Sequence, residues 1–552
     1  MSDRPRLPEE FLKRAESLPG FDPEEYEKAL EKSPVRALRI NPCAICEGGA
    51  SESGDLDCGT SESGDLKSRA EEIADALPGE LKAAGFLPDT FFFDFDHIGQ
   101  HPLHHAGAFY VQEPSAACPV ESVDIKPGMK VLDLCAAPGG KTTQAAGKTG
   151  PSGLVAANEV VPSRCRTLVG NIERLAVKNA VVSCLKPEEI AQAYGEFFDV
   201  VIVDAPCSGE GMFRKSAAAL NEWSVENVLM CAQRQRRILK AAAGCVADGG
   251  RMVYSTCTFS LEENEMNVDW FLREHPGFKL VPVPAKIAEK TADGIFFDGC
   301  AAADIRLARR FYPFTGEGEG QFFAVMEKRN AGGADVAGDS NSVGGAAPAG
   351  GSSGSRGSLK KPARGGGALS ALSPDQERIS REFLAETVCG DCEKKLKTGR
   401  HNNNIIVFER DIPVPESGVF SCGVKLGEIK KGRLVPAHHF FRAYGTEFKR
   451  KITLGSDDEE CGKYLRGEGF YVNSAKFGES IVPDESGESI VPDESGESAV
   501  SAGAGKCENP PGSGQIRDGW AAVLINGYAA GGAKITNGYA KNHYPKGLRR
   551  LT

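Results

Sequence analysis

The sequence predicts an α/β fold: a doubly wound, Rossmann-like parallel sheet with an N-terminal α+β module and a C-terminal α+β region. Between residues 128 and 328, short apolar runs alternate with helical stretches, as in a parallel sheet covered by helices on both faces. A segment rich in Gly, Ala and Ser at 329–368 then resembles a flexible linker. The length of 552 residues also indicates two or three domains.

The expected elements follow one another along this central part. Strands are predicted at 131–135, 154–158, 180–183, 200–203, 251–255, 306–312 and 321–327. Helices are predicted from 141, at 162–175, at 225–245 and from 262. The run 200–203 is wholly apolar, which is typical of a buried central strand.

The expected domains are an N-terminal module at 1–105, the sheet domain at 106–328, the linker at 329–368 and a C-terminal region at 369–552. Two acidic inserts interrupt them. Residues 43–66 contain SESGDL twice, and residues 478–498 contain GESIVPDES twice. Repeats this short and polar predict disordered surface segments, with an acidic binding tail as the alternative. Without their 13 acidic residues the net charge rises from −11 to about +2, which leaves room for basic surfaces.

Composition excludes several classes of protein. No run of eighteen apolar residues suggests a membrane span, and the charged first residues lack the apolar core of a signal peptide. A cytoplasmic location is therefore expected. The 17 cysteines are scattered and odd in number, which predicts reduced thiols. The pairs Cys43/Cys46 and Cys389/Cys392 lack a second pair at matching spacing, so no metal is predicted, with structural zinc as the alternative.

The first motif with chemical content is VLDLCAAPGGKTTQAA at 131–146. Gly139 and Gly140 allow a ligand to approach the backbone, and the following helix offers free amide groups. Ligands of an open parallel sheet bind beyond the carboxyl ends of its strands. Glu159 follows the next strand, where an acidic residue commonly holds a ribose diol.

Two further motifs bring thiols to the same edge. Asp204 and Cys207 follow the fourth strand in VIVDAPCSGEG, and Cys257 follows the fifth in MVYSTCTFSLEENE. In this topology the fourth and fifth strands are neighbours, so we expect both thiols in one pocket. Ser260 and Glu263 are predicted to form a capping box for the next helix.

These motifs resemble the Sun-type RNA 5-methylcytosine methyltransferases, and the chain as a whole resembles their bacterial RsmF/YebU-like ribosomal RNA branch. The resemblance rests on CAAPGGK (135–141), DAPCSGEG (204–211) and the pair Thr256–Cys257. It extends to LRIN (38–41), GAFYVQEPSAA (107–117), KGRLVPAHH (431–439), YLRGE (464–468) and GYAKNHYPKGLR (538–549).

The resemblance implies a class I methyltransferase that uses S-adenosyl-L-methionine. Its implied cofactor residues are Cys135, Ala136, Ala137, Pro138, Gly139, Gly140, Lys141, Glu159, Arg164 and Asp204. Cys257 is implied as the nucleophile and Cys207 as the thiol that assists release of the product, with Lys141 and Asp204 as further catalytic groups. Spacing alone does not fix these roles, since DNA cytosine methyltransferases use their Pro-Cys cysteine as the nucleophile.

Carbon 5 of cytosine needs such a thiolate, because addition at carbon 6 builds the electron density that takes up the methyl group. One departure from the family lies after the third strand, where Cys184, Leu185 and Lys186 replace the usual polar residues. The usual cofactor contact from that strand is therefore not carried over, although a backbone contact would replace it.

A basic stretch near the C-terminus predicts RNA contact. Lys534, Lys541, His543, Tyr544, Lys546 and Arg549 interleave cations with rings, which suits phosphate contact and base stacking. The expected partner is ribosomal RNA or the small ribosomal subunit, bound by a monomer. Alternatives are a transfer RNA substrate, a non-catalytic assembly factor, and an enzyme that methylates an amino group, although nitrogen methylation needs no thiol.

Overall fold

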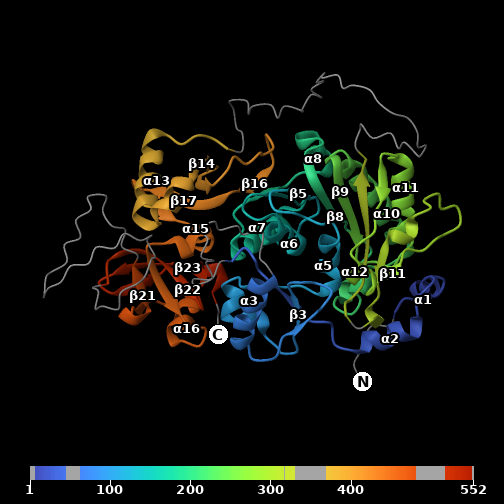
Figure 1. The fold of residues 1–552 in the computed structure, drawn as a ribbon, viewed down its shortest axis with the longest axis horizontal. Helices are drawn as coiled ribbons and strands as arrows, with labels where there is room; N and C mark the ends of the chain where they lie inside the picture. Colours follow the sequence, from blue (N-terminus) through green and yellow to red (C-terminus); the bar gives the residue numbers. More distant parts are fainter. Residues whose placement is uncertain (1–6, 45–62, 316, 330–368, 480–515, 550–552) are drawn as a thin grey trace, which may run out of the picture.

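The computed structural model describes residues 7–44, 63–315, 317–329, 369–479 and 516–549. The linker predicted from residue 330 onward and most of both acidic inserts lie outside these ranges. Within them, no helix is both long enough and apolar enough to cross a membrane. Figure 1 shows the central sheet flanked by the N-terminal module and the C-terminal region.

A ten-stranded central sheet confirms the predicted doubly wound α/β fold. Its strands are β5 (Lys130–Asp133), β6 (Leu154–Asn158), β7 (Ala180–Ser183), β8 (Phe198–Asp204), β9 (Val246–Thr256), β10 (Phe278–Leu280), β11 (Ala292–Asp293), β12 (Arg309–Phe311), β13 (Gln321–Lys328) and β16 (Val419–Cys422). The order is β11–β12–β13–β9–β8–β5–β6–β7–β16, with β10 beside β13. Strands β5 to β9 are parallel to one another. The strand order reverses between β5 and β8, and ligands bind beyond such a switch point.

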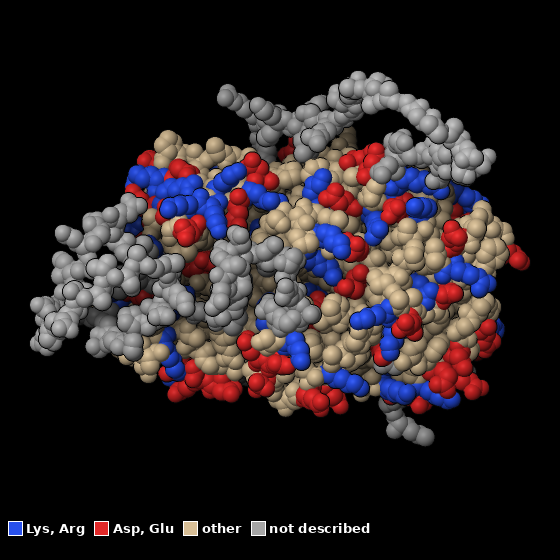
Figure 2. All heavy atoms as spheres, in the orientation of Figure 1, with Lys and Arg blue, Asp and Glu red and all other residues tan. Residues whose placement is uncertain are grey.

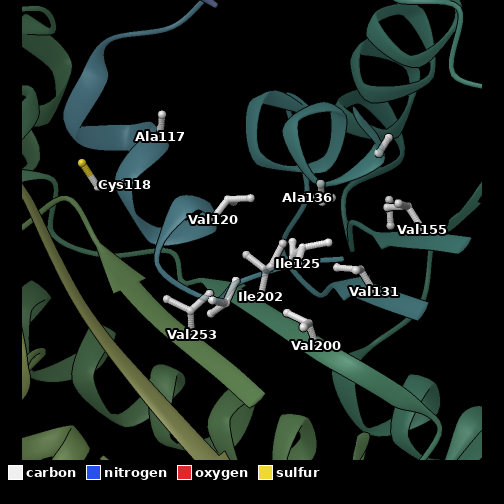
Figure 3. Packing of buried hydrophobic residues seen from close by; sticks show 14 of the residues in the cluster. Ala117, Cys118, Val120, Ile125, Val131, Ala136, Val155, Val200, Ile202 and Val253 are labelled. Atoms are coloured by element: carbon white, nitrogen blue, oxygen red, sulfur yellow. The ribbon is translucent and has the colours of Figure 1, made fainter. Parts of the chain in front are cut away.

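Helices cover both faces of this sheet. One face carries α5 (Pro114–Glu121), α6 (Gly140–Thr149) and α7 (Pro162–Arg174), and the other carries α8 (Pro187–Tyr194), α10 (Val225–Ala243) and α11 (Glu265–Glu274). Side chains alternate along the strands, so Val131 packs on the first face and Leu132 on the second. Figure 3 shows Cys118 and Val120 of α5 above Ile202 of β8. Continuous apolar runs suit a sheet buried on both faces.

The N-terminal module packs against the loops that follow β8 and β9. Its elements are α1 (Glu9–Glu16), α2 (Pro23–Glu31), β1 (Ala37–Ile40), α3 (Ser63–Asp75), β2 (Lys82–Ala83), β3 (Thr90–Phe92), α4 (Pro102–His105) and β4 (Phe109–Val111). The four strands form one sheet. Phe11 contacts Phe213 and Trp223 at ring-centroid distances of 5.1 and 5.8 Å. Aromatic packing therefore joins α1 to the loop after β8.

The C-terminal region contains two further sheets. The first has four strands, β14 (Lys397–His401), β15 (Asn404–Phe408), β17 (Val424–Lys430) and β18 (Arg433–Pro436), with helices α13 (Pro374–Thr387), α14 (Gly390–Lys395) and α15 (His438–Tyr444). The second has six strands, β19 (Arg450–Leu454), β20 (Phe470–Tyr471), β21 (Phe477–Glu479), β22 (Gly519–Ile525), β23 (Tyr528–Thr536) and β24 (Tyr539–Asn542), with helix α16 (Glu459–Arg466). The second sheet shares a hydrophobic core with the N-terminal module.

One C-terminal strand extends the central sheet. Strand β16 pairs antiparallel with β7, and the carbonyl of Gly418 accepts a hydrogen bond from the Cys184 amide at 2.8 Å. Asn158 bonds both backbone groups of Leu185, at 3.1 Å to N and 2.9 Å to O. The segment after the third strand, whose residues depart from the family pattern, is therefore held by Asn158 and by the C-terminal region.

Candidate functional site

The loop between β5 and α6 forms the floor of the site. The Ala136 amide donates to the Asn158 carbonyl at 2.8 Å, while Arg164 and Asn171 donate to the carbonyls of Ala137 and Pro138. Gly139 has φ +114°, and a side chain there would lie 3.0 Å from Leu168 of α7. Only glycine fits this turn without strain.

Three carboxylates follow neighbouring strands at the same edge. Burial raises the pKa of Asp133 to about 7, although Thr142 donates a hydrogen bond to Oδ2 at 2.7 Å. Its Oδ1 has no hydrogen-bond partner among the described residues. Glu159 accepts from the Val161 amide at 3.0 Å and pairs with Arg164 at 3.1 Å. With Asp204, these residues line the carboxyl ends of β6, β5 and β8.

Lys141 and Asp204 form an ion pair across this edge. The Lys141 Nζ lies 2.9 Å from Asp204 Oδ2, and the lysine side chain is only 9% exposed. Burial disfavours the charged lysine, but the charge of Asp204 and its hydrogen bond outweigh burial and raise the pKa of Lys141. Ser255 donates to Asp204 Oδ1 at 2.7 Å and Gln321 at 3.4 Å. The carboxylate is thus fixed, with 36% of its side chain exposed.

The two predicted thiols lie side by side. Cys207 Sγ and Cys257 Sγ are 3.2 Å apart, in the loops after β8 and β9. The hydrogen bond to Cys257 and, secondarily, burial raise the pKa of Cys207 well above its ordinary value. The Gly211 amide donates to the Cys257 carbonyl at 2.8 Å. Both thiols are partly exposed, as groups that react with a substrate must be.

The central domain is similar to known proteins. The family model described as 16S rRNA methyltransferase RsmB/F matches residues 121–327, which include the loop 134–140, the ion pair and both thiols. Residues 121–327 form an RsmB/F-family domain. A second model, described as the methyltransferase RsmF PUA domain, matches residues 506–550.

Curated relatives of this chain carry the name ribosomal RNA small subunit methyltransferase F. The Klebsiella pneumoniae protein is 38% identical over 240 residues, which cover 42% of this chain and 48% of that one. The Cronobacter sakazakii protein is 37% identical over 281 residues, which cover 49% and 54%. The chain spans about half the length of these relatives. A solved methyltransferase homologue from Pyrococcus horikoshii is 27% identical, with a TM-score of 0.47 and coverage of 58% and 94%.

Buried polar side chains brace the two thiol loops of the RsmB/F-family domain. Ser208 Oγ and Thr258 Oγ1 are 2.8 Å apart, directly after the two cysteines. Glu210 accepts from the Phe259 amide at 2.7 Å and from Trp223 at 2.9 Å. Ser208, Thr258 and Glu210 are not among the predicted site residues. Their signal was the run of polar residues directly after each cysteine.

The predicted capping box is wrong. Helix α11 begins at Glu265 with Asn264 as its N-cap, and the Ser260 hydroxyl instead donates to Glu262. Glu263 turns inward and accepts hydrogen bonds from the Ser208 amide at 3.1 Å and Gln235 at 2.7 Å. Its spacing from Ser260 fitted a cap, but the acid bonds the neighbouring loop.

The N-terminal module reaches the domain through buried arginine and glutamate side chains. Arg39, from the LRIN segment, donates to the Gly140 carbonyl at 3.2 Å and to Thr143 at 3.0 Å. Glu319, in the turn before β13, accepts from the Val35 amide and from Arg214, both at 2.7 Å. The first forty residues therefore contact both the floor of the site and the loop that carries Cys207.

The basic stretch near the C-terminus divides into exposed and buried members. Lys534 and Lys541 pair across β23 and β24 and are exposed, as is Lys546. Tyr544 is only 2% exposed, and its hydroxyl lies 3.1 Å from His105. The prediction that Tyr544 stacks on a base is therefore wrong, because the ring fills the core shared with the N-terminal module.

His543 and Arg549 are partly engaged within the protein. His543 lies 2.8 Å from the Pro436 carbonyl and against the Trp520 ring, and Arg549 donates to the Tyr544 carbonyl. Two aromatic side chains of the second C-terminal sheet are exposed instead, Tyr471 at 77% and Tyr539 at 39%. Their rings lie 5.1 Å apart on adjacent strands. Tyr471 lies outside the stretch that the sequence singled out.

Two other cysteine pairs in the described part of the chain interact, Cys165 with Cys184 and Cys389 with Cys392. All fourteen cysteines in the described ranges are free thiols. No cluster of three or more His, Cys, Asp or Glu side chains in those ranges is placed to hold a metal ion. Cys389 lies 3.3 Å from Glu447, and Cys46 falls outside the described residues.

Proposed function

We propose that this protein is an S-adenosyl-L-methionine-dependent RNA methyltransferase that forms 5-methylcytosine, with Cys257 as the nucleophile. The observation that carries the proposal is the pair of thiols 3.2 Å apart, in an RsmB/F-family domain beside the Lys141–Asp204 ion pair. Nitrogen methylation has no use for two thiols, whereas carbon-5 methylation requires one to attack the ring.

The residues at the carboxyl edge fit the cofactor. S-adenosyl-L-methionine carries an ammonium, a sulfonium and a ribose diol, and it supplies the methyl group when bound. Asp133 offers a buried oxygen without a partner, Glu159 lies after β6, and Asp204 remains partly exposed. Carboxylates suit the cations and the diol of this ligand. Residues 135–140 and Arg164 complete the proposed binding site.

Cys257, Asp204 and Cys207 each have a proposed role in the reaction. The Cys257 thiolate adds to carbon 6 of cytosine, and carbon 5 takes up the methyl group. Loss of the carbon-5 proton expels the thiolate and restores the aromatic ring. Asp204, held by Lys141 and Ser255, is placed to hydrogen-bond the pyrimidine while charge develops. Cys207 assists the expulsion, because its sulfur is adjacent to the leaving sulfur.

Ribosomal RNA of the small subunit is the proposed substrate. The curated relatives are named for it, and a PUA-domain model covers residues 506–550. Lys534, Lys541 and Lys546 are exposed for phosphate contact, and Tyr471 and Tyr539 for base stacking. In Figure 2, Lys and Arg also gather over the part of the molecule that carries α13 and β14. We propose a monomer that acts in the cytoplasm and flips its target cytosine out of the RNA.

The test uses labelled S-adenosyl-L-methionine and total RNA from cells that lack the protein, followed by bisulfite mapping. Wild type should methylate one cytosine, Cys257→Ala should lose activity by at least about 1,000-fold, and Cys207→Ala should accumulate a covalent RNA adduct. Cys300→Ala, a partly exposed thiol outside the site, serves as the matched control and should retain activity.

Other outcomes would select the alternatives. Full activity in Cys257→Ala, or label on a nitrogen, would favour an amino-group methyltransferase. A mapped transfer RNA cytosine would change the substrate. Binding of small subunits without any methyl transfer would favour an assembly factor.

A further inference from the structure

Glu263 is a buried carboxylate on the inner side of the Cys207 loop. The residue is 0% exposed and lies between the end of β9 and α11. One oxygen, Oε2, accepts from the Ser208 amide at 3.1 Å and from Gln235 Nε2 at 2.7 Å. The same Gln235 nitrogen donates to the Pro206 carbonyl at 3.1 Å. Glu263 therefore holds the backbone on both sides of Cys207.

This carboxylate has no cation to balance it. Among the described residues no Lys, Arg or His lies within ion-pair distance of Glu263, and Oε1 has no hydrogen-bond partner. The titratable groups around it are Glu210, Cys207, Tyr254 and Cys231. Tyr254 also fixes the Glu263 backbone through a hydrogen bond of 2.5 Å to its carbonyl. Burial, followed by the charge of Glu210, raises the pKa of Glu263 to about 7.

We propose that Glu263 is a positioning residue that fixes the Cys207 loop and keeps the Cys207 thiol protonated, so that Cys257 alone acts as the thiolate. This assignment of the thiols rests on the proposed function. A negative charge beside Cys207 disfavours a second negative charge on its sulfur. Cys207 then donates its S–H to the Cys257 sulfur 3.2 Å away. The arrangement distinguishes two chemically identical side chains.

The same donor serves the last step. In the elimination, water takes the carbon-5 proton, the electrons of that C–H bond form the double bond between carbons 5 and 6, and the bond between carbon 6 and the Cys257 sulfur breaks with its electron pair on that sulfur. The Cys207 S–H stabilises the resulting thiolate by a hydrogen bond, and the proton remains shared between the two sulfurs. Loss of Glu263 would remove one of the causes that raise the pKa of Cys207, so the thiol would ionise more readily and be a weaker donor in both steps.

The test measures thiol reactivity directly. In the full chain carrying Cys257→Ser, the alkylation of Cys207 by iodoacetamide is followed against pH by peptide mass spectrometry. Adding Glu263→Gln should speed alkylation at pH 7.5 by about tenfold, as expected when the thiol pKa falls by one unit. Glu262→Gln is the matched control, since the neighbouring Glu262 pairs with Arg14 at 2.6 Å near the surface. Glu263→Asp, which keeps the charge, should restore slow alkylation.

Equal alkylation of Cys207 with and without Glu263→Gln would overturn the proposal. Should Glu263→Gln fail to fold, the Cys257→Ser chain alone still decides. Its alkylation curve should show a second inflection near pH 7 where Glu263 titrates, and a single inflection would also overturn the proposal. Because no RNA is present, the result is independent of whether the protein methylates cytosine.

Discussion

At the scale of single residues, the Lys141–Asp204 pair offers a direct test of the catalytic edge. Lys141→Met should lower kcat about 100-fold, because the carboxylate loses the cation 2.9 Å away that orients it. Lys148→Met is the matched control on the same helix, since Lys148 pairs with Glu121 at 2.7 Å away from the site. The kcat of both variants is measured as the rate of methyl transfer to RNA, and circular dichroism shows whether each variant is folded. Unchanged kcat in Lys141→Met would remove the ion pair from the mechanism.

The ionised Asp133 carboxylate is expected to lower the stability of the ligand-free protein and to strengthen cofactor binding. Burial raises its pKa from 3.8 to about 7, so its contribution to stability is complete below pH 3.8 and is lost as the pH rises through 7. Asp133→Asn, which cannot ionise, should be more stable than wild type at pH 8 by about 1–4 kcal/mol and equal to it near pH 4.

Urea denaturation of the ligand-free protein at both pH values makes this measurement. The exposed Asp298→Asn variant should match wild type at both. Asp133→Asn should also weaken binding of S-adenosylhomocysteine in calorimetry. Lower stability of Asp133→Asn at pH 8 would show that the charged carboxylate is stabilised by the fold.

At the scale of elements, strand β16 connects the C-terminal region to the third strand of the central sheet. Gly418, which precedes it, has φ +73°, and a Cβ there would lie 2.2 Å from Leu185. Gly418→Ala should destabilise the protein by about 2–4 kcal/mol, since backbone strain and a clash add. Gly432→Ala has a similar φ of +72° but open space around it, so it should cost only about 1 kcal/mol. Equal losses in chemical denaturation would argue against the packing role of Leu185.

Elements with strong local patterns were predicted well. The bounds of β6 and β7 agree with the predicted 154–158 and 180–183. The parallel pairing of β5 to β9, and the neighbouring positions of β8 and β9, also agree with the prediction. Helix α8 was not predicted, and β16 lies beyond the linker, where no local pattern indicates a partner more than 200 residues away. Pairing between distant segments depends on the folded surface that receives them.

In the candidate site too, residues within continuous motifs were predicted, and contacts between distant segments were not. The thiols, the ion pair and the glycine loop belong to continuous motifs, and the structure brings them together at one edge. Glu263 and Tyr544 were misassigned because their neighbours in space come from other segments, Ser208 for one and His105 for the other. The spacing of residues along the chain can predict a helix cap or an exposed face. It cannot predict that a distant segment will bury a given side chain.

At the scale of the whole molecule, two histidines make stability depend on pH. Burial, followed by the charge of Arg174, lowers the pKa of the half-buried His104 of α4 to about 3. Burial, followed by the charges of Lys425 and Arg442, lowers the pKa of the buried His439 of α15 to about 4. Because the unfolded side chains titrate near 6.5, both histidines contribute stability above pH 6.5 that is lost as the pH falls toward their folded values.

The melting temperature should therefore drop between pH 7.5 and pH 5, with up to about 2 kcal/mol lost per histidine. His104→Gln should lose part of this acid sensitivity, because glutamine does not titrate. Differential scanning calorimetry at both pH values provides the comparison. A melting temperature that stays constant down to pH 5 would contradict the prediction.

The contacts of Arg39 and Glu319 have a consequence for how this protein can be divided. The family match begins at residue 121, yet two hydrogen bonds cross that boundary. Arg39, before it, donates to the Gly140 carbonyl, and Glu319, after it, accepts from the Val35 amide. A chain shortened to the matched residues would lack Arg39 and so expose its partners Gly140 and Thr143. It would also expose the aromatic surface on which α1 and α2 pack. A chimera that exchanges the catalytic domain between relatives should therefore include the first forty residues. The segment that must be exchanged as one piece is larger than the segment matched by the family model.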